Sequence, residues 1–265
     1  MVGAGNDFIV IDAAKGLNYK KLAGAVCSRT SGIGADGLLI LEQSKKADHR
    51  MRIINSDGSE AEMCGNGARC MAAYIAQKKP HAKSKFTMET LAGVVSAEIL
   101  KNKIRVRLSD PKDYQANIPL EINANKITVG YIDTGVPHTI VYVDHLKEMN
   151  VAAIGRVIRW HPQFAPRGTN VNFVEQIHEN LVEVRTFERG VEGETRACGT
   201  GSVAAAIVTY LKANPEIKIQ RHASMNVLTA SGEILNVMFD FQDDFITNVW
   251  LLGSAKFIAK GDYYV

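Results

Sequence analysis

Two short motifs in this sequence place a cysteine in front of a glycine-rich turn. The first, "MCGNGARCMAAYIA", spans 63–76, and the second, "ACGTGSVAAAIVTYL", spans 197–211. In both, Cys-Gly-x-Gly leads into a run of small and apolar residues typical of a buried helix. Cys64 and Cys198 are separated by about half of the chain. The repetition predicts two related half-sites, each of which begins a helix with a thiol.

A thiol at a helix N-terminus suits proton transfer. The positive end of the helix dipole and the N–H groups of the first turn can lower the pKa of a cysteine from about 8.5 into the range of about 3.5–7.5. The same N–H groups can bind a carboxylate and the negative charge that develops on it. One thiolate removes a proton from a carbon and a second thiol protonates the opposite face, so the stereocentre inverts. This chemistry is that of a racemase or an epimerase.

Composition limits the other classes of function. The chain has 265 residues, 46% hydrophobic residues and a formal net charge of +3, which gives no electrostatic sign of a nucleic-acid partner. No apolar run is long enough to cross a bilayer, and the residues after Met1 do not resemble a signal peptide. We therefore expect a cytoplasmic protein whose four cysteines are thiols. Their spacing contains no C-x-x-C pair, so no metal site is expected.

The rest of the chain reads as many short strands with a few helices between them. Strands are predicted over 6–13 and 170–177, for example, and a helix over 19–28. The spacing between most strands is too short for a crossover helix, which favours antiparallel pairing. The fold class predicted is α+β, built as two similar halves that each contribute one cysteine to a shared cleft.

Six segments resemble the diaminopimelate epimerase family, nearly from end to end of the chain. They are "GAGNDFIVID" (3–12), "GIGADGLLIL" (32–41), "NSDGSEAEMCGNGARC" (55–70), "TGVPHTI" (134–140), "NVNFV" (170–174) and "ERGVEGETRACGTG" (188–201). The resemblance implies that each half is a mixed or antiparallel barrel-like sheet around a central helix. It places Cys64 in a half over 1–113 and Cys198 in a half over 114–254, with a last strand over about 255–265 returning to the first half.

The resemblance also implies a set of site residues and an activity without pyridoxal phosphate or another cofactor. Cys64 and Cys198 would be the two bases. The residues that would bind the substrate are Asn6, Asn55, Gly65, Asn66, His138, Asn170, Glu188, Arg189, Gly199 and Thr200. Among these, an arginine, a carboxylate and neutral amides suit a substrate that carries a second amino-acid head group.

The activity implied is the interconversion of LL-2,6-diaminopimelate and meso-2,6-diaminopimelate, in the biosynthesis of lysine and peptidoglycan precursors. Two alternatives stay open. The thiol pair acts at the α-carbon and does not specify the distal group, so a racemase of another amino acid, such as glutamate or proline, would use the same machinery. A non-catalytic binding protein or a thiol redox sensor would keep the fold without exchanging a substrate proton. The expected partner is a small amino acid, and the sequence leaves a homodimer open.

Two departures from the family pattern bear on these expectations. Family members often have Gly-Asn-Pro-His where this chain has Gly135-Val136-Pro137-His138, and valine cannot supply the hydrogen bond of an asparagine. Substrate strictness is therefore in question. The glycine turn also begins at residue 3, closer to the start than in relatives, so a short first strand is expected.

Overall fold

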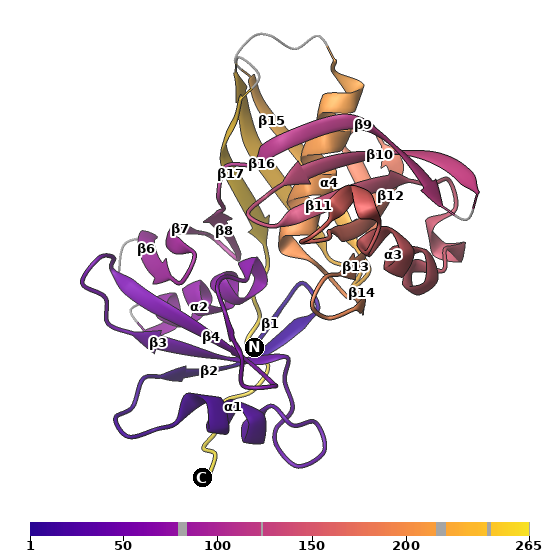
Figure 1. Cartoon of the computed structure of the whole chain (residues 1–265). Coiled ribbons are helices and arrows are strands. Elements are labelled where there is room, and N and C mark those ends of the chain that lie inside the picture. Colours follow the sequence, from indigo (N-terminus) through magenta and orange to yellow (C-terminus); the bar gives the residue numbers. More distant parts are fainter. Residues whose placement is uncertain (79–83, 123, 216–220, 243–244, 265) are drawn as a thin grey trace. The chain divides into compact units, whose positions relative to one another are not determined.

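A computed structural model describes residues 1–78, 84–122, 124–215, 221–242 and 245–264 (Figure 1). The chain divides into two compact units. The first consists of Met1–Arg107 together with Leu252–Val265, and the second of Leu108–Leu251. The α+β class predicted from the sequence is confirmed, and after one additional strand at its start the second unit repeats the order of strands and α-helices of the first.

The first unit is a mixed sheet with two helices. Its strands are β1 (Val2–Gly3), β2 (Asn6–Asp12), β3 (Gly37–Glu42), β4 (His49–Asn55), β5 (Glu60–Ala61), β6 (Lys85–Thr90), β7 (Gly93–Leu100) and β8 (Lys103–Arg107), and its helices are α1 (Tyr19–Val26) and α2 (Gly65–Lys78). β2 pairs with β3 in parallel and β4 with β6 in parallel. The pairs β1–β2, β3–β4, β4–β5, β6–β7 and β7–β8 are antiparallel.

The second unit follows the same plan. Its elements are β9 (Lys112–Ile122), β10 (Asn125–Asp133), β11 (Pro137–Tyr142), η1 (Leu146–Glu148), α3 (Val151–Arg159), η2 (Pro162–Phe164), β12 (Asn170–His178), β13 (Leu181–Glu188), β14 (Gly193–Thr195), α4 (Gly199–Ala213), β15 (Arg221–Thr229) and β16 (Ile234–Gln242), and the chain continues into β17 (Phe245–Gly253). β11–β12 and β13–β15 are parallel. The pairs β9–β10, β10–β11, β12–β13, β13–β14 and β15–β16 are antiparallel.

The pairing pattern establishes the internal repeat. Strands β1 to β4 correspond to β10 to β13 in pairing order and direction, β5 corresponds to β14, and β6 and β7 correspond to β15 and β16. Between the parallel strands lie α1 in one unit and α3 in the other, as parallel neighbours require a crossover connection. In each unit the short strand β5 or β14 leads directly to a cysteine and the helix behind it.

The helix behind each cysteine is the centre of its unit. α2 contacts β1, β2, β3, β4, β7 and β8, and α4 contacts β9 to β13, β15 and β16 (Figure 1). In α4 six consecutive residues, Val203–Val208, are buried, so every side of the helix is covered. A helix that is apolar all round is stable only when it is enclosed. The barrel-like sheet around a central helix, which the family resemblance implied, describes each unit.

Small residues make this enclosure possible. The first turns of α2 and α4 carry glycine, alanine and serine, which let the surrounding strands approach closely. The two crossover helices begin in the same way as each other. Asn18 before α1 and Asn150 before α3 each accept a hydrogen bond from a backbone N–H three residues later, at 3.1 Å in both cases. An asparagine N-cap satisfies one of the N–H groups that a helix leaves open.

The boundaries of the two units differ from those expected. The first unit ends at Arg107 instead of 113, because β9 begins at Lys112 and pairs with β10. The strand expected over 255–265 is not formed in the described residues 254–264. That segment makes one antiparallel bridge to Val2. The N–H of Val2 donates to the backbone oxygen of Lys256 at 2.9 Å, and the N–H of Lys256 donates to the backbone oxygen of Val2 at 2.8 Å.

Glycines in the two crossover helices give a matched test of packing. Gly24 in α1 is exposed, and an added Cβ would meet its nearest atom at 3.9 Å. Gly155 in α3 is buried, and an added Cβ would lie 2.5 Å from the Cβ of Phe187. Gly24→Ala is expected to raise the free energy of unfolding by about 0.5–1 kcal/mol, through helix propensity. Gly155→Ala is expected to lower it by about 1–3 kcal/mol, through overpacking. Urea denaturation measures both, and equal shifts of the same sign would contradict this account of α3.

Candidate active site

Cys64 lies immediately before the first residue of α2, as the sequence predicts. The N–H of Gly67 donates a hydrogen bond to its Sγ at 3.4 Å, and the N–H of Ala68 donates to its carbonyl oxygen at 2.8 Å. The side chain is half-buried. The sulfur therefore occupies the N-cap position of the helix, where it faces N–H groups of the first turn.

Cys198 has the same geometry at the start of α4. The N–H of Gly201 donates to its Sγ at 3.4 Å, and the N–H of Ser202 donates to its carbonyl oxygen at 2.8 Å. The hydroxyl of Thr200 lies 3.5 Å from the same sulfur. Two thiols in separate halves of the chain thus accept the same hydrogen bond from the third residue of their own helices. Negative charge on either sulfur would be stabilised by the helix N-terminus.

In the first unit, two of the predicted site residues lie together. Asn66 is buried, and its Nδ2 donates to Oδ1 of Asn6 at 2.6 Å. Its Oδ1 accepts from the guanidinium of Arg69 at 2.7 Å, and Nδ2 of Asn6 in turn donates to Asp36 at 2.9 Å. This chain of polar groups fixes the orientation of both amides beside the first turn of α2.

Asn55 has a local environment of its own at the end of β4. Its Nδ2 donates to the hydroxyl of Ser59 at 2.9 Å, and its backbone N–H donates to the oxygen of the same residue at 2.8 Å. The turn 55–59 is closed by these bonds. The side chain is half-buried, so part of it stays accessible.

In the second unit, Asn170 joins two other predicted residues. β11 and β12 run in parallel with His138 opposite Asn170. Nδ2 of Asn170 donates to the oxygen of Pro137 at 2.9 Å, and its Oδ1 accepts from the backbone N–H of Arg189 at 2.9 Å. The buried amide therefore connects the start of β11 to the segment that follows β13, and brings His138, Asn170 and Arg189 into one region.

Glu188 and Arg189 lie at the end of β13, and both are perturbed by burial. Burial raises the pKa of Glu188 above its ordinary value. Burial, with the nearby guanidinium groups of Arg167 and Arg159, lowers the pKa of Arg189. Nη1 of Arg189 also donates to the backbone oxygen of Arg167 at 3.2 Å. A partly desolvated guanidinium and a partly desolvated carboxyl group are suited to a ligand that carries charge of both signs.

His138 is fully buried and electrically neutral. Burial, followed by the charge of Arg189, lowers its pKa to about 3 from the ordinary value of 6.5. Its Nδ1 lies 3.1 Å from Nδ2 of Asn172, while its Nε2 has no hydrogen-bond partner in the part of the chain that the structure describes. Asn172 was not among the residues predicted from the sequence. It lies two positions after Asn170 on one strand, and the alternation of side chains along β12 places both on the same face.

Two other features are absent from the described residues. No group of three or more histidine, cysteine, aspartate or glutamate side chains there is arranged to hold a metal ion. None of the helices in those ranges is both long enough and apolar enough to span a membrane.

Comparison with known proteins decides the family. The sequence model of the family described as diaminopimelate epimerase matches residues 1–112 and 130–258. This chain belongs to the diaminopimelate epimerase family. It is 41% identical to the diaminopimelate epimerase of Aquifex aeolicus (strain VF5), over 98% of this chain and 94% of that protein. It is 39% identical to the diaminopimelate epimerase of Carboxydothermus hydrogenoformans, over 100% of this chain and 98% of that protein. The resemblance inferred from the six sequence segments is confirmed.

Solved structures support the fold. A PhzF-family phenazine biosynthesis protein from Bacillus anthracis superposes with a TM-score of 0.71 at 18% identity, covering 96% of this chain and 92% of that one. A hydroxyproline epimerase from Agrobacterium vitis, solved with bound trans-4-OH-L-proline, gives a TM-score of 0.67 at 16% identity. The match covers 96% of this chain and 86% of that one. At these identities the similarity concerns the architecture alone.

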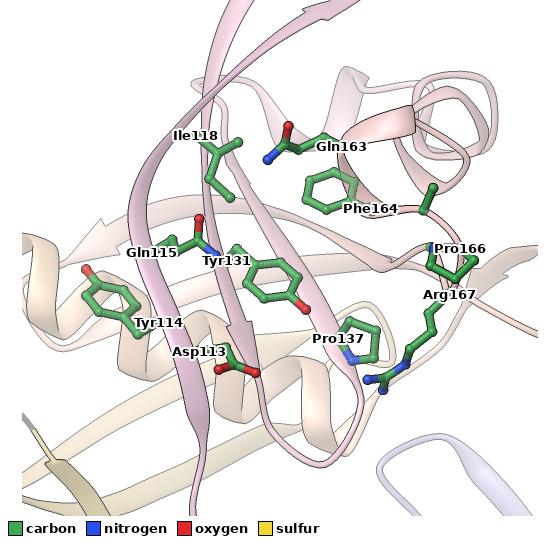
Figure 2. A pocket seen from close by; sticks show the side chains of 12 residues that line it. Asp113, Tyr114, Gln115, Ile118, Tyr131, Pro137, Gln163, Phe164, Pro166 and Arg167 are labelled. Atoms are coloured by element: carbon green, nitrogen blue, oxygen red, sulfur yellow. The ribbon is translucent and has the colours of Figure 1, made fainter.

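The second unit of this family member also contains a cavity of about 350 Å³ (Figure 2). Tyr131 and Phe164 form one wall, with their rings nearly parallel and 5.8 Å apart. Arg167 lies at another side and forms an ion pair with the buried Asp133 at 3.6 Å. None of the predicted site residues lines the cavity, although Pro137, which does, directly precedes His138.

The first turns of α2 and α4 differ in how tightly they are packed. A Cβ on Gly201 would lie 2.3 Å from Oδ1 of the buried Asn172, whereas a Cβ on Gly67 would lie 3.2 Å from the end of the Leu39 side chain. Gly201→Ala is expected to lower the free energy of unfolding by about 1–3 kcal/mol. Gly67→Ala is expected to stay within about 1 kcal/mol of wild type, because leucine can shift and alanine favours the helix. Urea denaturation of both variants tests the difference, and equal losses would contradict it.

The neutral state of His138 predicts a pH dependence of stability. The folded pKa lies below the unfolded value, so the unfolded chain binds more protons and stability falls as the pH drops from about 6.5 towards 3. The contribution of His138 is fully present above pH 6.5 and is lost at about 1.4 kcal/mol per pH unit below it. Urea denaturation of wild type and His138→Gln at pH 7, 6 and 5 isolates this contribution. If the free energy of unfolding fell equally with pH in the two proteins, His138 would not be buried in its neutral form.

Proposed function

We propose that this chain interconverts LL-2,6-diaminopimelate and meso-2,6-diaminopimelate by proton transfer at the α-carbon, with Cys64 and Cys198 as the two bases. The observation that carries the proposal is the duplicated geometry of the thiols. In a chain that belongs to the diaminopimelate epimerase family, both sulfurs accept an N–H at 3.4 Å at the start of a central helix. The product is a precursor of lysine and of peptidoglycan, and we place the reaction in the cytoplasm, where thiols stay reduced.

In the proposed cycle the α-carbon of the substrate loses one proton and gains another on its opposite face. The thiolate of one cysteine takes the α-proton, and the electron pair of the broken C–H bond moves onto the α-carbon and its carboxylate. The thiol of the other cysteine then gives its proton to the opposite face and becomes a thiolate. Each forward conversion leaves the two sulfurs with exchanged protonation states, which is the state that catalyses the reverse reaction. Before a second forward conversion, proton exchange with solvent returns the pair to its first state.

Charge stabilisation is the larger part of the catalytic task, because a proton next to a carboxylate is weakly acidic. We assign it to the first-turn N–H groups of Gly65 and Asn66 in α2 and of Gly199 and Thr200 in α4. N–H groups at a helix start lack acceptors within the helix and point along the helix dipole. Fixed donors of this kind stabilise developing negative charge without reorganising during the reaction.

The distal amino-acid group of the substrate is assigned to the remaining polar residues. Arg189 would bind the distal carboxylate and Glu188 the distal ammonium group, with neutral amides from Asn6, Asn55 and Asn170 completing the set. Asn170 supports this assignment because it already holds the backbone of Arg189 at 2.9 Å. Val136 contributes no hydrogen-bonding side chain, so discrimination against shorter amino acids depends on this charged set.

Deuterium exchange tests the proposed function. Reduced protein is incubated with LL-diaminopimelate in heavy water, and α-deuterium and configuration are followed by NMR and chiral separation. Wild type is expected to incorporate deuterium with inversion, and Cys64→Ala and Cys198→Ala are each expected to lose at least about a thousandfold in inversion rate, because each removes a proton-transferring group. Cys27→Ala is the matched control, since burial, with the charges of Asp7 and Asp36, raises the pKa of Cys27 to about 11 and keeps it a thiol outside both motifs.

Two outcomes would contradict the proposal. Inversion of glutamate, proline or another amino acid, with diaminopimelate left untouched, would keep the two-thiol mechanism and overturn the substrate. Absence of exchange with every amino acid tested, in protein shown to be fully reduced, would favour the redox sensor instead.

A further inference from the structure

Asn172 lies at the centre of a buried polar cluster in the second unit. The residue is fully buried on β12. Its Nδ2 lies 3.1 Å from Nδ1 of His138 and donates to the backbone oxygen of Thr139 at 3.1 Å. Its Oδ1 accepts from the hydroxyl of Thr186 at 3.0 Å. The side-chain amide thus has a partner for both N–H groups and for its oxygen.

The backbone oxygen of Thr139 determines which way this amide points. A carbonyl oxygen only accepts hydrogen bonds, so the amide nitrogen, and not its oxygen, must face it. The reverse orientation would place two oxygens 3.1 Å apart in a buried site, with no proton between them. The hydroxyl of Thr186 accommodates the favoured orientation by donating to Oδ1.

The orientation of Asn172 in turn determines the protonation of His138. Because Nδ2 presents an N–H to Nδ1 of the imidazole, Nδ1 must be the bare, accepting nitrogen. A neutral imidazole then carries its proton on Nε2. A doubly protonated ring would place two N–H groups against each other, so the cluster also disfavours the cationic form.

We infer that Asn172 is a positioning residue that holds His138 as the neutral tautomer with its proton on Nε2, so that His138 acts as a hydrogen-bond donor and not as a base. The part that concerns catalysis rests on the proposed function. Nε2 of His138 is buried and has no partner among the described residues. A buried donor without an acceptor is unfavourable, and this cost is recovered when an acceptor binds. An anionic group of the substrate is an acceptor of the required kind.

The same amide also contacts the first turn of α4. A Cβ on Gly201 would lie 2.3 Å from Oδ1 of Asn172, and the N–H of Gly201 is the group that donates to Sγ of Cys198 at 3.4 Å. One buried side chain therefore orients the imidazole and packs against the residue that binds the catalytic sulfur. A glycine is required at 201 because Asn172 occupies the space of its side chain.

The tautomer is tested by NMR on the full-length protein labelled with ¹⁵N at histidine. The signals of His138 are identified among those of the seven histidines by their loss in His138→Gln. In wild type, Nε2 is expected to show the shift of a protonated ring nitrogen and Nδ1 that of a bare one. In Asn172→Asp, a carboxyl oxygen replaces Nδ2. When its proton is donated to the oxygen of Thr139, the same oxygen accepts from Nδ1, so the proton of the imidazole is expected to move from Nε2 to Nδ1.

Thr186→Val is the matched control for disturbance of the cluster. It removes the hydroxyl that donates to Oδ1 of Asn172 and leaves the two contacts of Nδ2 intact, so the Nε2–H tautomer is expected to persist. Melting temperatures of the two variants are compared first, to separate loss of fold from change of tautomer. For diaminopimelate inversion, kcat of Asn172→Asp is expected to fall by about 10²- to 10³-fold, the range seen when one hydrogen-bond donor to developing negative charge is removed.

The possible outcomes separate this inference from the proposed function. A wild-type spectrum with the proton on Nδ1, or an unchanged tautomer in Asn172→Asp, would overturn the role of Asn172. An equal fall of kcat in both variants, at equal melting temperature, would overturn its catalytic consequence. The predicted tautomers in a protein that inverts no diaminopimelate would leave the positioning role standing and remove the proposed function.

Discussion

The hydrogen bond from the third residue of a helix to the sulfur that precedes it is the constraint on which the rest of each unit depends. A cysteine at this position requires a helix start that is held in place, and the helix starts here are held by complete enclosure. Enclosure requires strands on all sides, which in turn requires small residues along the helix so that the strands can approach. The sheet, the alanine-rich helices and the glycines of the two motifs are consequences of one requirement, which is to fix a thiol without letting its backbone move.

The two units meet this requirement with different polar surroundings. Around Cys64 the amides of Asn6 and Asn66 form a chain that ends at charged groups, Asp36 and Arg69. In the second unit the corresponding strands carry a cluster of uncharged partners, in which the amide of Asn172 contacts one nitrogen of the His138 ring. The repeat thus conserves the backbone geometry of the thiols and differs in the electrostatic environment of each half.

Much of this arrangement is predictable from the sequence, and the exceptions have physical causes. The cysteine motifs predict their helices because Cys-Gly-x-Gly and the small-residue run are local signals, and the duplication is visible because both motifs are short and similar. Asn172 was not predicted, because its importance comes from a parallel pairing of β11 with β12 and from the nearness of Gly201, neither of which is local in sequence. In place of the strand expected over 255–265, the described residues 254–264 form a single bridge at Lys256. The pattern of aliphatic and aromatic residues there does not indicate how few backbone partners the segment has. The unit boundary at Arg107 depends on the pairing of β9 with β10, which is also determined by tertiary structure and not by local sequence.

The bridge between Val2 and Lys256 has a consequence for how the chain is made. The second unit is continuous in sequence, so it can fold as soon as its own residues have left the ribosome. The first unit is not, because Leu252–Val265 belongs to it. Its N-terminal part is synthesised first and must wait, incomplete, through the synthesis of the whole second unit. Domains usually fold in the order of their synthesis, and here the order of completion is reversed. During that interval the first cysteine motif is present on a helix whose enclosing unit lacks its last segment, and hydrophobic surface exposed in an incomplete unit is prone to aggregation.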